Sequence, residues 1–475
     1  MVGGYLLLKD IAELKTLASA AKTLPFTRIY LAFFRPTLMY EKGSKTLKNT
    51  GLDDFDFSDV AQGISDLTAG GVEVFLSLGG WNAGCFPYFY ARYSVGGYGD
   101  HTPNFWEIQQ YAGGDLDKCV VSNQYCYVCE PPSEHATLDS FDFFPEPAGH
   151  PTWEAAKSYV ESKAGTPAAQ WNEDMKPGSA YTDPKTGISM TVPGRALDDG
   201  HNPYQDFVYL ASDLNVTGVD LDYEEMWHAD YYKTDASPSP SSLEENPKSL
   251  FRLNARPGVE SGNYSGPWNL HQTVYKYTAI AKDLVSNVEA IAPHLQVTTA
   301  AAAVGAWSGD WWGGNLKGLW NEMQQKFPDL LEQIGVNVMT YDLSKDEDFH
   351  ECPDDQDCPL DKQVGYYMNT YKTANIKAAV GYEISTPAYP NPVHDKQDQL
   401  PLTKDMLSSI ISNTQKEHPV GGFLWEIFKK VDDPSHASPQ DVAQAICKSV
   451  RGESDSRCSC TIPAAPSKPI HGKKH

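Results

Sequence analysis

Short apolar runs, often rich in β-branched residues, alternate along this chain with longer stretches that have the 3.6-residue period of an amphipathic helix. Eight strand-and-helix pairs of this kind predict an α/β protein folded as a closed (β/α)8 TIM barrel. The expected strands are Tyr5–Leu8, Arg28–Phe34, Glu73–Gly79, Gly218–Glu224, Gln296–Ala303, Asn337–Leu343, Ala378–Glu383 and Gly422–Ile427. The expected helices are about Ile11–Lys22, Ser58–Ala69, Pro203–Leu214, Asn269–Ile291, Leu319–Ile334, Gln363–Ala374, Lys404–Lys416 and Pro439–Val450.

Two long segments interrupt this alternation, a large one at about 81–202 after the third strand and a smaller one at about 226–268 after the fourth. Each follows the carboxyl end of a strand, which is where barrel enzymes build their sites. The first insertion is either a disulfide-pinned excursion or a wall of a substrate cleft, and both interpretations stay open. We expect residues 1–451 to form one barrel domain with these insertions, followed by a flexible, cysteine-containing tail at 452–475.

The charge balance excludes some classes of partner. The chain has 475 residues with 38 Lys and Arg against 62 Asp and Glu, a formal net charge of −24 at pH 7. Nucleic acids and anionic membranes would be repelled by such a field, so we expect neither as a partner. No apolar run approaches the ~20 residues that a membrane span needs. The expected partner is neutral or cationic.

The cysteines indicate the compartment. Several of the nine lie in close local pairs, which favours an oxidising environment. Cys126 and Cys129 have a spacing that could hold zinc, but a second Cys/His pair at suitable spacing is missing, so disulfides are favoured and no metal or other cofactor is expected. The amino-terminal residues show no signal-peptide pattern. The chain is therefore either cytosolic or a mature form, and we expect an extracellular, monomeric protein.

The fourth strand carries the most informative pattern. Asp220, Asp222 and Glu224 alternate with apolar residues, so all three carboxyls lie on one side of the strand, about 6.6 Å apart from one to the next. In a barrel that side is the lumen, where burial of a charge costs several kcal/mol and stability alone does not explain three acids. The alternative is a solvated edge strand, against which the apolar residues from Tyr209 onward argue.

These acids suggest a particular chemistry. Glu224 comes last, at the mouth of the barrel, where a carboxyl with a raised pKa can protonate a leaving oxygen. Asp222 lies beneath it and points the same way, so the pair cannot flank a glycosidic bond from opposite faces as an ordinary retaining mechanism requires. The nucleophile must come from elsewhere, and a 2-acetamido carbonyl of the substrate is the obvious candidate.

Four motifs together resemble glycoside hydrolase family 18, the chitinases and related enzymes. The acids of the fourth strand are similar to the family's Asp-x-x-Asp-x-Asp-x-Glu signature, with Thr217 in place of the first Asp. The other three motifs are Ser77-Leu-Gly-Gly80 on the third strand, Met339-Thr-Tyr-Asp342 on the sixth and Trp425 on the eighth.

The resemblance implies substrate-assisted retaining hydrolysis. Glu224 would be the acid/base, and Asp222, backed by Asp220 and Ser77, would hydrogen-bond the acetamido N–H while Tyr341 donates to the acetamido oxygen. The residues to which it assigns substrate binding are Ser77, Gly80, Trp81, Met339, Asp342 and Trp425. Each motif also has a structural interpretation: a tight turn at 77–80, a core aromatic at Tyr341 and a packing residue at Trp425.

The resulting hypothesis is a chitinase that cleaves β-1,4 bonds between N-acetylglucosamine units of chitin by endo attack. An endo-β-N-acetylglucosaminidase acting on N-glycans would need the same chemistry, and a chitin-binding lectin would use the same barrel, usually with the catalytic Glu replaced. The short span from Ile384 to Gly421 leaves no room for the extra domain that deepens the cleft in many processive relatives. A shallow cleft favours endo action.

Overall fold

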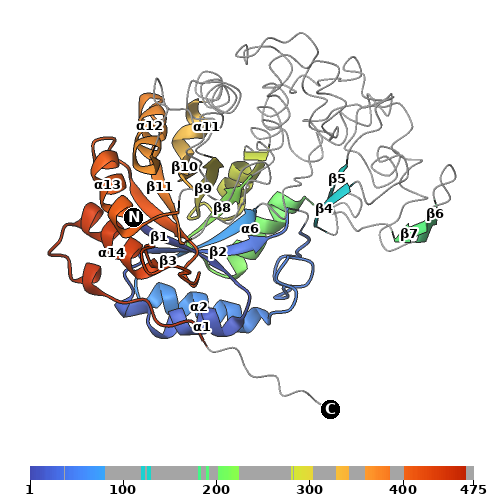
Figure 1. Ribbon diagram of the computed structural model, residues 1–475. Coiled ribbons are helices and arrows are strands. Elements are labelled where there is room, and N and C mark those ends of the chain that lie inside the picture. Colours follow the sequence, from blue (N-terminus) through green and yellow to red (C-terminus); the bar gives the residue numbers. More distant parts are fainter. Residues whose placement is uncertain are drawn as a thin grey trace, which may run out of the picture.

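Eight parallel strands close into one barrel in the computed structural model of the chain (Figure 1). The structure describes residues 1–36, 38–80, 202–223, 280–281, 283–302, 328–341, 359–385 and 401–466, together with the backbone of four short strands between 119 and 191. The order around the barrel is β1-β12-β11-β10-β9-β8-β3-β2, so the first and last strands meet and close the ring. The predicted TIM barrel is confirmed.

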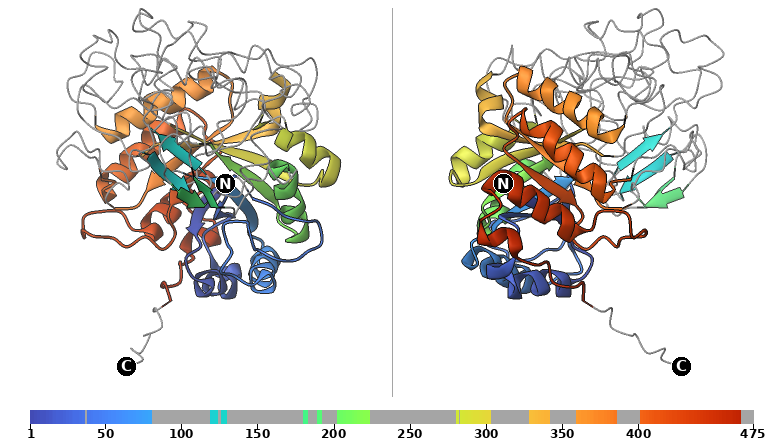
Figure 2. Two further views of the ribbon diagram at one scale, coloured as in Figure 1. Left: turned by 90° about the vertical axis from the view of Figure 1, so that its right-hand side faces the viewer. Right: turned by 60° about the vertical axis from the view of Figure 1, so that its left-hand side comes forward.

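Helices cover the outside of the ring of strands (Figures 1 and 2). The barrel strands are β1 (Val2–Leu7), β2 (Arg28–Phe34), β3 (Glu73–Gly79), β8 (Gly218–Asp222), β9 (Gln296–Ala302), β10 (Ile334–Met339), β11 (Ala378–Glu383) and β12 (Gly421–Trp425). The helices are α1 (Ile11–Ser19), α2 (Phe57–Ala69), α6 (Pro203–Asp213), α11 (Pro328–Gln333), α12 (Leu360–Thr373), α13 (Lys404–Gln415) and α14 (Pro439–Arg451). Residues 280–281 and 283–291 are also helical.

Capping residues explain where two of these helices begin. The carboxamide oxygen of Asn202 accepts hydrogen bonds from the backbone N–H groups of Tyr204 and Gln205, at 3.0 and 3.2 Å, ahead of α6. Ser438 and Asp441 form a reciprocal capping box at the start of α14. Both signals lie in the local sequence, and both helices begin where it predicts.

The sixth barrel strand differs from its expected bounds. β10 begins at Ile334, three residues before the predicted start and inside the helix expected over 319–334, and it ends at Met339 instead of Leu343. The residues of β10 pair in continuous register with β9, from Ile334 opposite Val297 to Met339 opposite Ala302. Pairing with β9 therefore determines where β10 begins and ends, and the local residue pattern does not predict this pairing.

Two small antiparallel hairpins lie in the first insertion, formed by β4 (Cys119–Asn123) with β5 (Cys126–Cys129) and by β6 (Ala180–Thr182) with β7 (Ser189–Thr191). The remainder of both insertions lies outside the described residues. Whether the first insertion lines a cleft stays a prediction.

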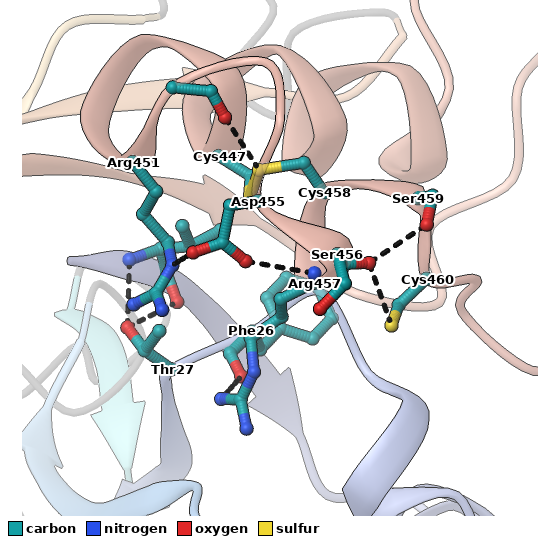
Figure 3. Close-up of a disulfide and its surroundings, with 12 residues drawn as sticks. Phe26, Thr27, Cys447, Arg451, Asp455, Ser456, Arg457, Cys458, Ser459 and Cys460 are labelled. Carbon is teal, nitrogen blue, oxygen red and sulfur yellow. Dashed lines mark hydrogen bonds and ion pairs between the residues drawn. A yellow bond between two sulfur atoms is a disulfide. The ribbon is translucent and has the colours of Figure 1, made fainter.

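The segment after α14 is fastened to the barrel (Figure 3). Cys458, in the short 3-10 helix η7 (Ser456–Ser459), forms a disulfide with Cys447 of α14, and Cys460 is a free thiol. Cys458 is thus bonded to a helix residue and not to its near neighbour Cys460. Arg457 donates to the carbonyl oxygens of Phe26 and Gly71, at 3.1 and 3.3 Å. Flexibility of the tail stays a prediction for residues 467–475, which lie outside the described part.

Within the described residues, no helix is long and apolar enough to cross a membrane. Localisation and oligomeric state stay predictions.

Candidate active site

Alternate side chains of the barrel strands fill the lumen. The ring of Tyr5 stacks on Tyr30 with 4.5 Å between centroids, and Tyr30 lies 5.4 Å from Phe75. Ala32, Ala379 and Phe423 complete the buried part of this cluster. The lumen is therefore a packed interior in which any polar group must find its partners within the protein.

Asp220 of β8 lies in this interior with no exposed surface, as the period-two pattern predicts. Its Oδ2 accepts hydrogen bonds from the hydroxyls of Tyr5 at 2.9 Å and Ser77 at 2.8 Å. Its Oδ1 accepts from the hydroxyl of Thr298 at 2.6 Å and from Nδ2 of Asn337 at 3.3 Å. Four donors on four different strands thus surround one carboxyl group, an arrangement that stabilises its ionised form.

Burial and hydrogen bonding have opposite effects on Asp220. Burial raises the pKa of its carboxyl, and the hydrogen bonds from Thr298, Ser77 and Tyr5 lower it, with burial the larger influence. Burial also raises the pKa of Tyr5 well above its ordinary value, and the nearby charge of Asp220 raises it further. Tyr5 therefore stays a protonated hydrogen-bond donor at neutral pH.

Asp222 lies two residues further on the same face and is 3% exposed. Gly79 is its partner in the β3–β8 ladder, and the N–H of Gly80 donates to its carbonyl oxygen at 3.0 Å. Gly80 has a φ of +82°, and a Cβ there would come within 2.7 Å of the Phe33 ring. The second glycine of the Ser-x-Gly-Gly motif therefore provides a close approach that another residue would prevent.

Two aromatic residues of the predicted site lie at the same end of the barrel. Trp425 ends β12, is partly buried, and stacks on Phe33 with 5.6 Å between ring centroids. Tyr341 follows β10, is partly buried, and packs edge-on against Phe423 at 6.5 Å. Gly381 makes room for it, because a Cβ on Gly381 would lie 2.9 Å from the Tyr341 ring. Both residues lie at the carboxyl end of the strands, and neither is fully buried.

The structure brings most of the predicted residues together. Ser77, Gly80, Asp220, Asp222, Met339, Tyr341 and Trp425 all lie on barrel strands or directly after them. Glu224, Trp81 and Asp342 lie outside the described residues, so their roles stay predictions. Thr217, which departs from the family signature, uses its hydroxyl to accept a hydrogen bond from the N–H of Val74 at 3.2 Å, and so links β8 to β3.

Sequence reasoning missed a further acid at the mouth. Glu383 ends β11 opposite Trp425 in the ladder, and it is 4% exposed. Its Oε1 accepts from Nζ of Lys429 at 2.6 Å, which ties β11 to the segment after β12. The sequence did contain a signal for this residue. Ala379, Gly381 and Glu383 are two positions apart from one to the next, so strand alternation places Glu383 on the lumen face with the other two.

Among the described residues, no cluster of three His, Cys, Asp or Glu side chains could hold a metal ion.

No protein-family model and no curated protein matches the chain. Solved structures that match include a GH18 chitinase from Pseudoalteromonas aurantia, with 11% identity and a TM-score of 0.40 over 89% of this chain and 93% of that one. Domain 2 of a chitinase from Pyrococcus furiosus matches with 10% identity and a TM-score of 0.42 over 94% and 93%. The catalytic domain of a β-amylase from Paenibacillus polymyxa matches with 10% identity and a TM-score of 0.40, over 94% of this chain and 98% of that one.

These TM-scores and identities are too low to carry an argument about family or activity.

Proposed function

We propose that this protein is a glycoside hydrolase that cleaves β-1,4 bonds between N-acetylglucosamine units of chitin by endo attack, with retention of configuration. The observation that carries the proposal is the pair Asp220 and Asp222, both buried on one face of β8. Glu224 continues this series by sequence. A barrel has no structural need for such a row of acids, so the row indicates catalysis.

In the proposed reaction, Glu224 protonates the glycosidic oxygen as the bond breaks, and the acetamido carbonyl oxygen of the same sugar attacks the anomeric carbon. Asp222 accepts a hydrogen bond from the acetamido N–H and balances the positive charge that develops on this group. Tyr341 donates to the acetamido oxygen, and Trp425 supports the sugar ring. Glu224, now a carboxylate, then removes a proton from the water that opens the cyclic intermediate.

The test is product analysis on a panel of three substrates: chitohexaose, a high-mannose glycoprotein and cellohexaose. We expect chitohexaose to give shorter oligomers that retain the β configuration when first formed. We expect no cleavage of cellohexaose, because it has no acetamido nucleophile. Release of glycan from the glycoprotein alone would support the N-glycan enzyme instead, and binding of chitohexaose without any cleavage would support the lectin.

The same panel identifies the acid. Glu224→Gln should keep the fold and bind chitohexaose, but its kcat should fall by a factor on the order of 10³ or more, because the leaving oxygen has no proton donor. Glu225→Gln is the matched control, since the alternation that predicts a lumen position for Glu224 predicts the opposite side for Glu225, and its loss should leave kcat almost unchanged. Near-normal turnover by Glu224→Gln would contradict the assignment.

A further inference from the structure

Two of the four donors to Asp220 come from parts of the chain that none of the sequence motifs covers. Thr298 lies on β9 and Asn337 on β10, and both are buried, at 4% and 2% exposed. The Thr298 hydroxyl is the nearest donor to the carboxyl, at 2.6 Å. Asn337 uses Nδ2 for two acceptors, Oδ1 of Asp220 and the hydroxyl oxygen of Tyr5, both at 3.3 Å.

The orientation of the Asn337 amide follows from its other neighbours. The hydroxyl of Tyr30 donates to Oδ1 of Asn337 at 3.3 Å, while the Tyr30 oxygen itself accepts from the guanidinium of Arg28 at 3.5 Å. Each group therefore donates a hydrogen bond to the next, from Arg28 to Tyr30, from Tyr30 to Asn337 and from Asn337 to the carboxyl of Asp220. The reverse amide orientation would place a carbonyl oxygen against a carboxylate.

We propose that Thr298 and Asn337 are positioning residues that keep Asp220 ionised, so that a fixed negative charge lies directly behind Asp222. This inference deepens the proposed function and rests on it for its catalytic consequence. The fixed charge would favour protonation of Asp222 in the empty site, and it would favour the positive charge that develops on the acetamido group during reaction. Neither Thr298 nor Asn337 touches the substrate in this arrangement.

Other titratable groups lie around Asp220 and its donor Tyr5. From β8 the neighbouring acid is Asp222, and from β1, β2 and β10 the neighbouring phenols are Tyr5, Tyr30 and Tyr341. The positive charge of Arg28, at the amino-terminal end of the lumen, favours the ionised form of Asp220. Arg28 also forms a salt bridge with Glu73 at 2.7 Å, which partly neutralises this charge. Glu383 of β11 lies at the mouth, paired with Lys429. The Thr298 and Thr299 substitutions below leave all of these groups in place.

β9 offers a matched pair of substitutions for the test. Thr298→Val removes the donor to Asp220 while keeping the shape of the side chain. Thr299→Val removes an equally buried hydroxyl one residue later, which donates instead to the carbonyl oxygen of Leu221 at 2.7 Å. Both variants lose one buried hydrogen bond, so both should lose similar stability, and only the first should change the ionisation of Asp220.

The first measurement is the pH profile of kcat/KM on chitohexaose. If Asp220 must be ionised, activity falls as the pH is lowered through its pKa. Losing a donor raises that pKa, so the acidic limb should move upward by about one pH unit in Thr298→Val. Thr298→Ser should restore the wild-type limb, Tyr30→Phe should move it in the same direction by less, and Thr299→Val should leave it in place. An unchanged limb in Thr298→Val would overturn the proposal.

The second measurement needs no turnover, and so it separates this inference from the proposed function. Because the pKa of Asp220 is raised in the folded protein, its effect on stability is favourable at low pH and is lost as the pH rises through the folded pKa. The difference in unfolding free energy between Thr298→Val and Thr299→Val should therefore grow as the pH rises above the ordinary carboxyl range toward neutrality. A constant difference would overturn the inference, whereas a wild-type protein that cleaves no substrate would overturn only the proposed function.

Discussion

Single residues in this barrel have roles that their chemical type alone does not reveal. Gly43 and Gly80 both have a left-handed φ, at +81° and +82°. Around Gly43 a Cβ would meet no atom within 4 Å, whereas at Gly80 it would meet the Phe33 ring, which stacks on Trp425. The two glycines are therefore equal in backbone strain and different in surroundings, and this difference can be measured.

We expect Gly80→Ala to destabilise the protein by about 2–4 kcal/mol, the sum of left-handed strain and a steric clash in a packed interior. Gly43→Ala is the control and should cost only the strain, about 1 kcal/mol. Urea unfolding measures both values, and KM for chitohexaose should rise only in Gly80→Ala because Phe33 and Trp425 are displaced. Equal losses in the two variants would show that the approach to Phe33 has no energetic importance.

At the scale of elements, the segment after α14 links the carboxyl-terminal part of the barrel to its amino-terminal part. Its disulfide holds η7 against α14 (Figure 3). Arg457 of η7 donates to the carbonyl oxygens of Phe26, which precedes β2, and Gly71, which precedes β3. Cys447 and Cys458 are both nearly inaccessible to solvent, at 0% and 2% exposed. This fastening lies at the amino-terminal end of the strands, opposite the candidate site, and so it should affect stability and not catalysis.

Replacing Cys447 and Cys458 together by Ala should lower the unfolding free energy by about 2–3 kcal/mol, as expected for a bridge that spans 11 residues. The kcat on chitohexaose should stay near the wild-type value at temperatures well below Tm. Cys460→Ala is the control, because that thiol is free and its loss should leave Tm unchanged. A fall in kcat without a fall in Tm would mean that the fastening acts on the site.

The elements also show what the sequence could predict. β2, β3 and β11 have the bounds that their short apolar runs predict, since both faces of these strands are buried. The ends of β10 could not be predicted, because they follow from its pairing with β9. The donors to Asp220 were likewise missed, apart from Ser77: Tyr5 precedes Asp220 by 215 positions, and only closure of the barrel brings the two together.

For the whole molecule, charge is the dominant property. The net charge of −24 leaves an attractive field for cationic polymers. Chitin is neutral, but partly deacetylated chitin carries ammonium groups on the same backbone. In the proposed reaction, attraction to the protein surface and turnover in the lumen would therefore be separable, since only an acetylated sugar can supply the acetamido nucleophile.

We expect binding of partly deacetylated chitin to weaken strongly as salt is raised, because screening at about 0.15 M already limits exposed charges to a range of ~8 Å. Binding of neutral chitohexaose should change little. Sequencing of the new reducing ends should find acetylated sugars at the cleavage point at every salt concentration. A deacetylated sugar at that point would contradict substrate assistance, and salt-independent binding would contradict the role of net charge.

The meeting of the first and last strands also has a consequence for how the protein is made. β1 lies between β2, which is translated soon after it, and β12, which is translated only after most of the chain. Until then β1 presents an unpaired edge on an incomplete sheet, and such edges recruit strands from other chains. Newly made copies therefore pass through a long interval in which association with one another competes with closure, so yield should depend on keeping nascent chains apart.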